Sequence, residues 1–167
     1  MAYNFRDESP VLGPDTAIEL PNGAGAATNV KVQVVEYFSV FLPAAANAVN
    51  QPIFIAPPSA SAASGALPLG QYSLVSVSVR FGTASTSGTL QIERTPSGTA
   101  VGSGTNLLSG TVSLAGTANT VVNGFPSSSL SAANRILAAG DSLSLIFGGT
   151  LTNLANCTVT IAVARTV

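Results

Sequence analysis

The chain has 167 residues and a formal net charge of −1, and only 8% of its residues are charged, against roughly 25% in an average soluble domain. Six scattered basic residues exclude the basic surface that nucleic-acid binding needs, and a single cysteine with no histidine excludes a disulfide framework and a Cys/His zinc site. A hydrophobic fraction of 46% is also unlike intrinsic disorder.

Residues 1–29 differ from the rest of the chain in charge and proline content. They hold five of the thirteen charged residues and three prolines, and proline at this density disfavours helices and central strands. Two interpretations remain open, a frayed terminus or an extended arm that orders against a partner. Such an arm would offer apolar side chains and its single arginine to the partner, namely Phe5, Arg6, Val11, Leu12, Ile18 and Leu20.

The first strand signal begins at Val30 and is predicted to end at Pro43. Polar and apolar residues alternate at its start, which is the pattern of a strand with one buried face. Further along, apolar residues occur on both faces of the strand. This predicts burial on two sides for Tyr37, Phe38, Val40 and Phe41.

The next segments predict loops and two more strands. Residues 43–52 and 59–71 are rich in small residues and proline and predict loops, with a short strand over 53–55 between them. Two alternating stretches joined by a glycine-containing turn then predict a β-hairpin over about 72–95. The first of these strands is predicted to bury Val75, Val77, Val79 and Phe81.

The C-terminal part predicts one helical turn and two strong strands. The turn covers 130–134, with Ser128 or Ser129 as its cap. The strands cover 141–147 and 157–165, and each alternates with period two. Their predicted inward side chains are Leu143, Leu145, Phe147, Val159, Ile161 and Val163.

Two weaker strands are predicted over 108–114 and 120–122. The count is then about eight strands with almost no helix, which is typical of an all-β sandwich or barrel. Eight strands fit a jelly roll, whereas an immunoglobulin-like sandwich fits less well because paired cysteines and a buried tryptophan are missing. We therefore predict a single jelly-roll-like β-sandwich over residues 30–167, preceded by the arm at 1–29.

Few residues could carry catalysis or bind a metal. Beyond residue 29 the carboxylates are Glu36, Glu93 and Asp141. Glu36 and Glu93 could form a glycosidase pair, but we expect Glu93 to be a solvated strand residue, and Glu36 to lie at a strand edge or to pair with an arginine. Asp141 follows Gly140 and is expected to accept hydrogen bonds from backbone amides in a turn, with calcium binding as the alternative.

Cys157 begins an apolar strand and is expected to be a small buried side chain. We therefore expect no catalytic residue, no cofactor and no metal site, and predict that the chain is not an enzyme. The first residues lack the apolar segment of a secretory signal, and no run of about 20 apolar residues could cross a bilayer. We expect synthesis in a cytoplasm and no membrane partner.

The C-terminal third carries a resemblance to a known family. Leu137–Phe147 contains a Gly-Asp turn followed by alternating leucines, then comes Gly-Gly-Thr-Leu, and Cys157–Val163 is rich in valine and threonine. Over roughly residues 70–167 this sequence pattern resembles that of the jelly-roll decoration, or cement, proteins of tailed bacteriophages. Phage tail-fibre and receptor-binding tips and some bacterial surface adhesins share it.

The resemblance implies a structural role on the outside of an assembled capsid. Copies, expected to be trimers, would bridge neighbouring major capsid proteins and stabilise the shell, so the partners would be the major capsid protein and the chain itself, and the location the virion surface. The alternative is a fibre head that binds a host glycan or protein. A fibre would normally carry a longer repetitive shaft, which the sequence lacks.

The scarcity of charge supports an assembled state. A folded monomer of this size exposes roughly 7,600 Å², so thirteen charges average one per about 580 Å². Surfaces with so little charge favour association. We infer that much of the surface is covered by protein in the working state.

Overall fold

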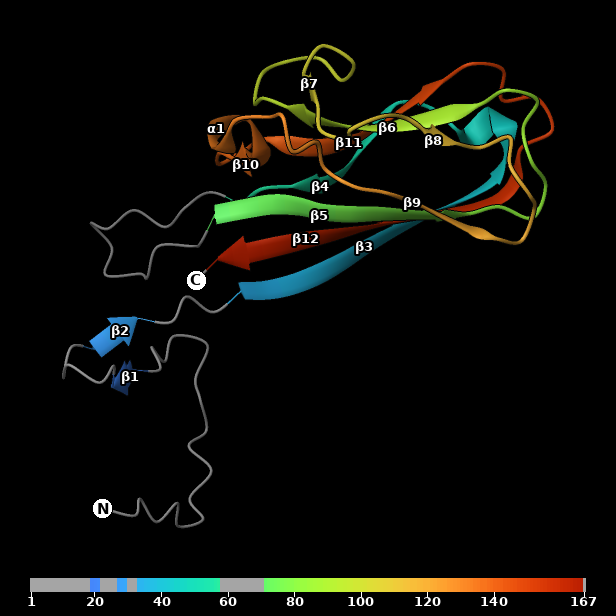
Figure 1. Ribbon diagram of the computed structural model, residues 1–167. Helices are drawn as coiled ribbons and strands as arrows, with labels where there is room; N and C mark the ends of the chain where they lie inside the picture. Colours follow the sequence, from blue (N-terminus) through green and yellow to red (C-terminus); the bar gives the residue numbers. More distant parts are fainter. Residues whose placement is uncertain (1–18, 22–26, 30–32, 58–70, 167) are drawn as a thin grey trace, which may run out of the picture.

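A computed structural model describes residues 19–21, 27–29, 33–57 and 71–166. Two antiparallel sheets pack face to face as two layers of a β-sandwich (Figure 1). The predicted all-β class and the single sandwich are therefore confirmed. None of the helices within the described ranges is long and apolar enough to cross a membrane.

The first sheet is the lower layer in Figure 1. It contains the three longest strands of the described residues. Its order runs from an edge shared by two short strands, through β5 and β12, to the opposite edge at β3. The five strands are β3 (Gln33–Ala44), β5 (Gln71–Arg80), β12 (Ala155–Thr166), β9 (Val121–Gly124) and β10 (Ile136–Leu137).

The second sheet is the upper layer and has the order β4-β11-β6-β7, with β8 also paired to β6. Its strands are β4 (Gln51–Ile55), β6 (Thr89–Thr95), β7 (Thr105–Asn106), β8 (Val112–Ser113) and β11 (Ser142–Gly148). Two short helices complete the sandwich, η1 (Ala45–Asn47) and α1 (Ala132–Arg135).

The connections follow the jelly-roll pattern. Successive strands from β3 to β6 alternate between the two sheets, and so do the strands from β9/β10 through β11 to β12. The short strands β7 and β8 share one position beside β6, and β9 and β10 share one beside β5. The result is eight strand positions in two four-position sheets, as in a jelly roll.

Most of the segment predicted as an arm lies outside the described residues. Within it, β1 (Glu19–Pro21) pairs antiparallel with β2 (Ala27–Asn29), and Leu20 pairs with Thr28. Leu20 is thus the one predicted contact residue of the arm that falls in a described strand. The others lie outside the described residues, namely Phe5, Arg6, Val11, Leu12 and Ile18.

The predicted hairpin over 72–95 is wrong, because β5 and β6 belong to opposite sheets. The connection between them crosses from one layer to the other, and neighbouring loops satisfy its backbone groups. Gly82 N–H donates to Ala155 O at 3.1 Å, and Ser85 N–H donates to Leu114 O at 2.9 Å. Two alternating strands joined by a turn therefore do not pair here.

The core lies between the sheets and explains why alternation predicted most of its members. Val77, Val79 and Phe81 of the first sheet are fully buried, as predicted. Val75 is exposed, contrary to the prediction. The register between β5 and β12 shifts so that Ala162 pairs with Ser76 but Val163 pairs with Leu74. The bulge leaves Val75 unpaired and reverses the alternation, so that the buried side chains before it are Leu74 and Tyr72.

The predicted burial of β3 on two sides is also wrong for the described part of the chain. Phe38 and Val40 pack against the core, whereas Tyr37 and Phe41 are 72% and 58% exposed. The reason is that β3 is an edge strand, paired only with β12, and no described element covers its outer face. The strand also continues past Pro43 to Ala44.

The predicted helical turn is present one or two residues further along the chain. It forms α1, and its cap is Ser131 rather than Ser128 or Ser129. The Ser131 side chain accepts a hydrogen bond from Asn134 N–H at 3.4 Å. The predicted C-terminal strands are both present, with Leu143, Leu145, Val159, Ile161 and Val163 buried and Phe147 partly buried.

We expect Gly124→Ala to destabilise the fold. An added Cβ would lie 2.7 Å from Val112 Cγ2 and 2.9 Å from Val77 Cγ1, inside the core. Overpacking of this kind costs about 1–3 kcal/mol, so urea unfolding should show a free energy of unfolding lower by that amount. Gly110→Ala is the control, because nothing lies within 4 Å of its added Cβ. Equal effects of the two substitutions would contradict the packing described here.

Candidate functional site

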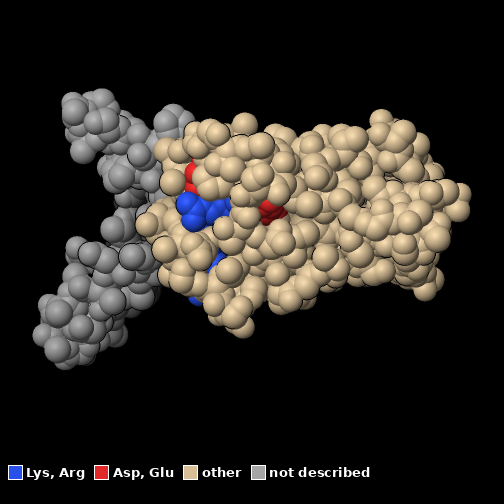
Figure 2. Space-filling view, turned by 90° about the horizontal axis from the view of Figure 1, so that it is seen from above, with Lys and Arg blue, Asp and Glu red and all other residues tan. Residues whose placement is uncertain are grey.

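Exposed charge is nearly absent from the described sandwich. Residues 33–57 and 71–166 contain seven charged residues, of which only Arg80 and Arg135 are exposed. Glu93 and Asp141 are buried. Figure 2 views the molecule from the side of the second sheet, and its charged atoms gather toward one end while the rest of that face is uncharged.

Arg94 of β6 and Asp141, the residue before β11, form an ion pair. Arg94 Nε donates to Asp141 Oδ2 at 2.8 Å, and Arg94 Nη1 donates to Ala133 O at 2.8 Å. The arginine therefore ties β6 to α1 and to the residue that precedes β11. With a side chain only 20% exposed, it serves as a structural crosslink.

Asp141 occupies the turn role that the sequence predicts. Its Oδ2 accepts from Ala138 N–H at 3.0 Å, and its Oδ1 accepts from Ser97 N–H at 3.2 Å. Burial raises the pKa of this carboxyl, but the hydrogen bonds from Ala138, Arg94 and Ser97 outweigh burial and hold the pKa below its ordinary value. Both oxygens thus already accept from N–H donors, which is a poor arrangement for a calcium ligand.

Glu93 is buried, which contradicts its prediction as a solvated residue. Its Oε1 accepts from Gly102 N–H at 3.0 Å and lies 2.6 Å from Thr95 Oγ1. The chain after β6 folds back over this side of the strand, so closely that a Cβ at Gly104 would meet the backbone of Arg94. Strand alternation identifies a face but does not reveal a loop that covers it.

The structure separates the two glutamates considered as a glycosidase pair. Glu36 lies half-buried on β3, the edge strand of the first sheet, as predicted. Glu93 lies on β6 of the second sheet. Across the described ranges, no three cysteine or acidic side chains are grouped so that they could hold a metal ion.

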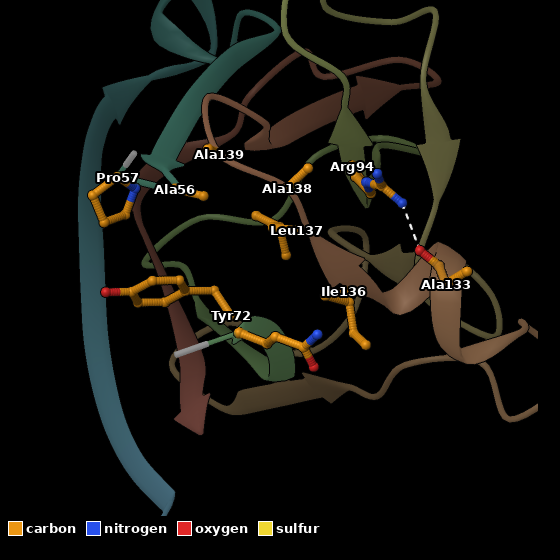
Figure 3. Close-up of a pocket in the computed structure, with 10 residues that line it drawn as sticks. Ala56, Pro57, Tyr72, Arg94, Ala133, Ile136, Leu137, Ala138 and Ala139 are labelled. Atoms are coloured by element: carbon orange, nitrogen blue, oxygen red, sulfur yellow. Dashed lines mark hydrogen bonds between the residues drawn. The ribbon is translucent and has the colours of Figure 1, made fainter. Parts of the chain in front are cut away.

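A pocket of about 630 Å³ is lined in part by Arg94, as Figure 3 shows. Its walls are mainly small or apolar side chains from β10 and the residues after it, with Tyr72 and Arg94 among the polar contributors. Figure 3 shows Arg94 turned toward Ala133 and bonded to it. Asp141 and Ala133 accept hydrogen bonds from this guanidinium. Among the described residues, the pocket walls contain no acidic residue, no cysteine and no lysine.

Cys157 is buried and free, as predicted. Burial raises the pKa of its thiol to about 11. The thiol is therefore protonated at neutral pH, and only the thiolate is a nucleophile. Cys157 acts as a small core side chain.

Several of the exposed large apolar side chains among the described residues lie on the outer face of the first sheet. We call Val35, Tyr37 and Phe41 of β3 the β3 ridge, because all three are exposed and alternate on one face. At the opposite edge of the same sheet, Val121 and Phe125 are also exposed, and we call these two residues the β9 edge.

Hydroxyl and amide groups lie between the two apolar edges and satisfy one another. Ser39 Oγ lies 2.7 Å from Thr160 Oγ1, and Ser78 Oγ donates to Asn123 Oδ1 at 2.7 Å. The outer face therefore has apolar side chains at both edges and mainly uncharged polar groups between them, with Arg80 exposed at the end of β5. Sequence reasoning recognised the apolar residues of β3 but assigned them to the core; the signal was an apolar pattern on both faces of one strand.

Comparison with known proteins gives no match, either to a family model or to a curated protein or solved structure.

We expect acid to weaken the wild-type fold more than the fold of Asp141→Asn. Because the pKa of Asp141 in the fold lies below the unfolded value of about 3.9, its carboxylate stabilises the fold above about pH 4, and this stabilisation is lost as pH falls through the folded pKa. Urea unfolding should show the variant less stable at neutral pH by about 1–3 kcal/mol, since Arg94 loses its charged partner.

This difference in the free energy of unfolding should shrink when the same titration is taken to about pH 2. A difference that stays constant over the whole range would contradict the role given to the ionised Asp141.

Proposed function

We propose that this chain is a structural virion protein that binds the outside of an assembled phage capsid and joins neighbouring major capsid proteins. The observation that carries the proposal is the nearly uncharged surface of the sandwich, on which large apolar side chains remain exposed. Tyr37, Phe41 and Phe125 are each more than half exposed, and only two charged residues are exposed in the described sandwich.

Such a surface suits permanent contact with protein better than contact with water. Contiguous exposed apolar patches on monomers rarely exceed a few hundred Å² and mark interaction sites when they do. A near-zero net charge favours association, and jelly-roll sandwiches are used in capsid and lectin domains. Burial of apolar area at several contacts, multiplied by multivalency, would hold such a protein on a shell.

The geometry also supports a structural role over a catalytic one. The two buried carboxylates in the described sandwich accept hydrogen bonds from backbone N–H groups, and one of them is paired with Arg94. The thiol of Cys157 is buried and protonated. These groups stabilise the fold and offer no reacting atom at the surface.

The partners in this proposal are the major capsid protein and further copies of the chain, expected as a trimer on the virion surface. Residues 1–29 would form a second contact with the shell. The support for this contact comes from the sequence, where apolar residues recur in a charged, proline-containing segment.

We expect the full chain to co-sediment with empty shells assembled from the major capsid protein of the same genome. A variant with Phe5, Leu12 and Ile18 replaced by serine should bind at least 100-fold more weakly, because each buried side chain contributes about 1.5–3 kcal/mol and 1.4 kcal/mol is a factor of ten. Replacing the arm residues Asn4 and Thr16 by serine is the matched control and should leave binding unchanged.

Absence of the full chain from the shell pellet would overturn the proposal. If the full chain instead adsorbs to host cells, and particles that lack it lose their adsorption, the protein is a fibre head. If the triple arm variant binds with wild-type affinity, the arm does not contribute to shell binding and the sandwich alone makes the contact.

A further inference from the structure

The two apolar patches of the first sheet lie on the same face at opposite edges. An added Cβ at Gly124 would point into the core toward Val77 and Val112. Its neighbours Asn123 and Phe125 therefore point outward, and Phe125 is 61% exposed. The β3 ridge is at the other end of the sheet order, with β12 and β5 between.

The edges also differ in shape. The β3 ridge consists of side chains that project from an edge strand, whereas the surface near the β9 edge is hollowed. One groove of about 300 Å³ is lined by Leu74, Pro126, Arg135 and Ile136, among others. A second, of about 280 Å³, is lined by Val79, Arg80, Val121 and Thr158, among others. A projecting aromatic side chain thus has a concave counterpart on the same molecule.

The charges favour contact between unlike edges. Each groove contains one of the two exposed arginines of the described sandwich, Arg80 or Arg135. The β3 ridge is uncharged, because Glu36 alternates with Tyr37 and shares the inner face of the strand with Phe38 and Val40. An aromatic ring over a guanidinium adds a cation–π attraction. Contact between two β9 edges would instead bring arginines of like charge together.

Strand direction fits the same arrangement. Three antiparallel pairings separate β3 from β9, through β12 and β5, so β9 runs opposite to β3. A neighbouring copy in a similar orientation would offer its β9 to β3 as an antiparallel partner. The twelve residues of β3 extend about 40 Å, long enough to lie along the whole opposite edge, where β10 and β9 pair with β5 between Tyr72 and Arg80.

We propose that copies of this chain assemble head to tail, with the β3 ridge of one copy seated on the grooved β9 edge of the next. The occupant of each edge is a second copy of the same chain. An interface between two different patches is heterologous, and it closes into a ring when the rotation between copies permits. This contact goes beyond shell binding and holds whether or not a shell is present.

The test uses the full chain and three variants in sedimentation velocity at micromolar concentration. The ridge variant carries Tyr37→Thr and Phe41→Thr, and the edge variant carries Val121→Thr and Phe125→Ser. The control is Ile55→Thr, since Ile55 is as exposed as Phe125 but lies on β4 of the other sheet. Wild type and control should sediment as a closed ring of three or more copies, and each variant as a monomer with at least tenfold weaker association.

An equal mixture of ridge and edge variants should form a heterodimer, because one intact ridge meets one intact edge and no further contact is left. This recovery also shows that both variants are folded. The proposal would be overturned if the wild type is a monomer or if the mixture of variants stays monomeric. It would also be overturned if the control loses the ring, or if the wild type is a dimer that the edge variant preserves. Failure of shell binding with the ring intact would instead remove only the proposed function.

Discussion

Side chains from the two sheets meet in one apolar layer, and the rest of the structure depends on this layer. Val77, Val79 and Ile161 of the first sheet are fully buried, as are Leu90 and Leu145 of the second. Burial of each such side chain is worth about 1.5–3 kcal/mol. The inner faces supply this core, and β3 is held in its sheet by β12 alone.

Several of the charged side chains likewise hold the fold together. The buried carboxylates of Glu93 and Asp141 stabilise loops, and Arg94 crosslinks β6 to α1. What remains on the described outer surface is hydroxyl, amide and apolar groups with two arginines. Binding of a partner to such a surface is stabilised little by long-range electrostatic attraction and mainly by burial of apolar side chains. The proposed assembly and the proposed attachment to a shell both follow from this property.

Alternation in the sequence predicted the strands and most of the core, because side chains on a strand point to opposite faces regardless of what the strands pack against. Alternation could not reveal which strands pair, so β5 and β6 were predicted as a hairpin although they lie in opposite sheets. It also could not locate the bulge that turns Val75 outward, nor the loop that buries Glu93.

The candidate surface was visible in the sequence but misassigned. An apolar pattern on both faces of β3 is the pattern of a strand covered on two sides, and the described chain covers only one. The pattern is therefore explained if another protein chain supplies the second cover. Turn chemistry was the more reliable guide, since Gly140 and Asp141 predicted the backbone hydrogen bonds that the structure contains.

Hydroxyl-radical footprinting of the full chain over a range of concentrations tests directly whether protein covers the outer face of the first sheet. If it does, oxidation of Tyr37, Phe41 and Phe125 should fall together as the concentration rises, while Ile55 stays as reactive as in the dilute chain. Undiminished oxidation of Tyr37 and Phe125 at the highest concentration, in a folded chain, would contradict it.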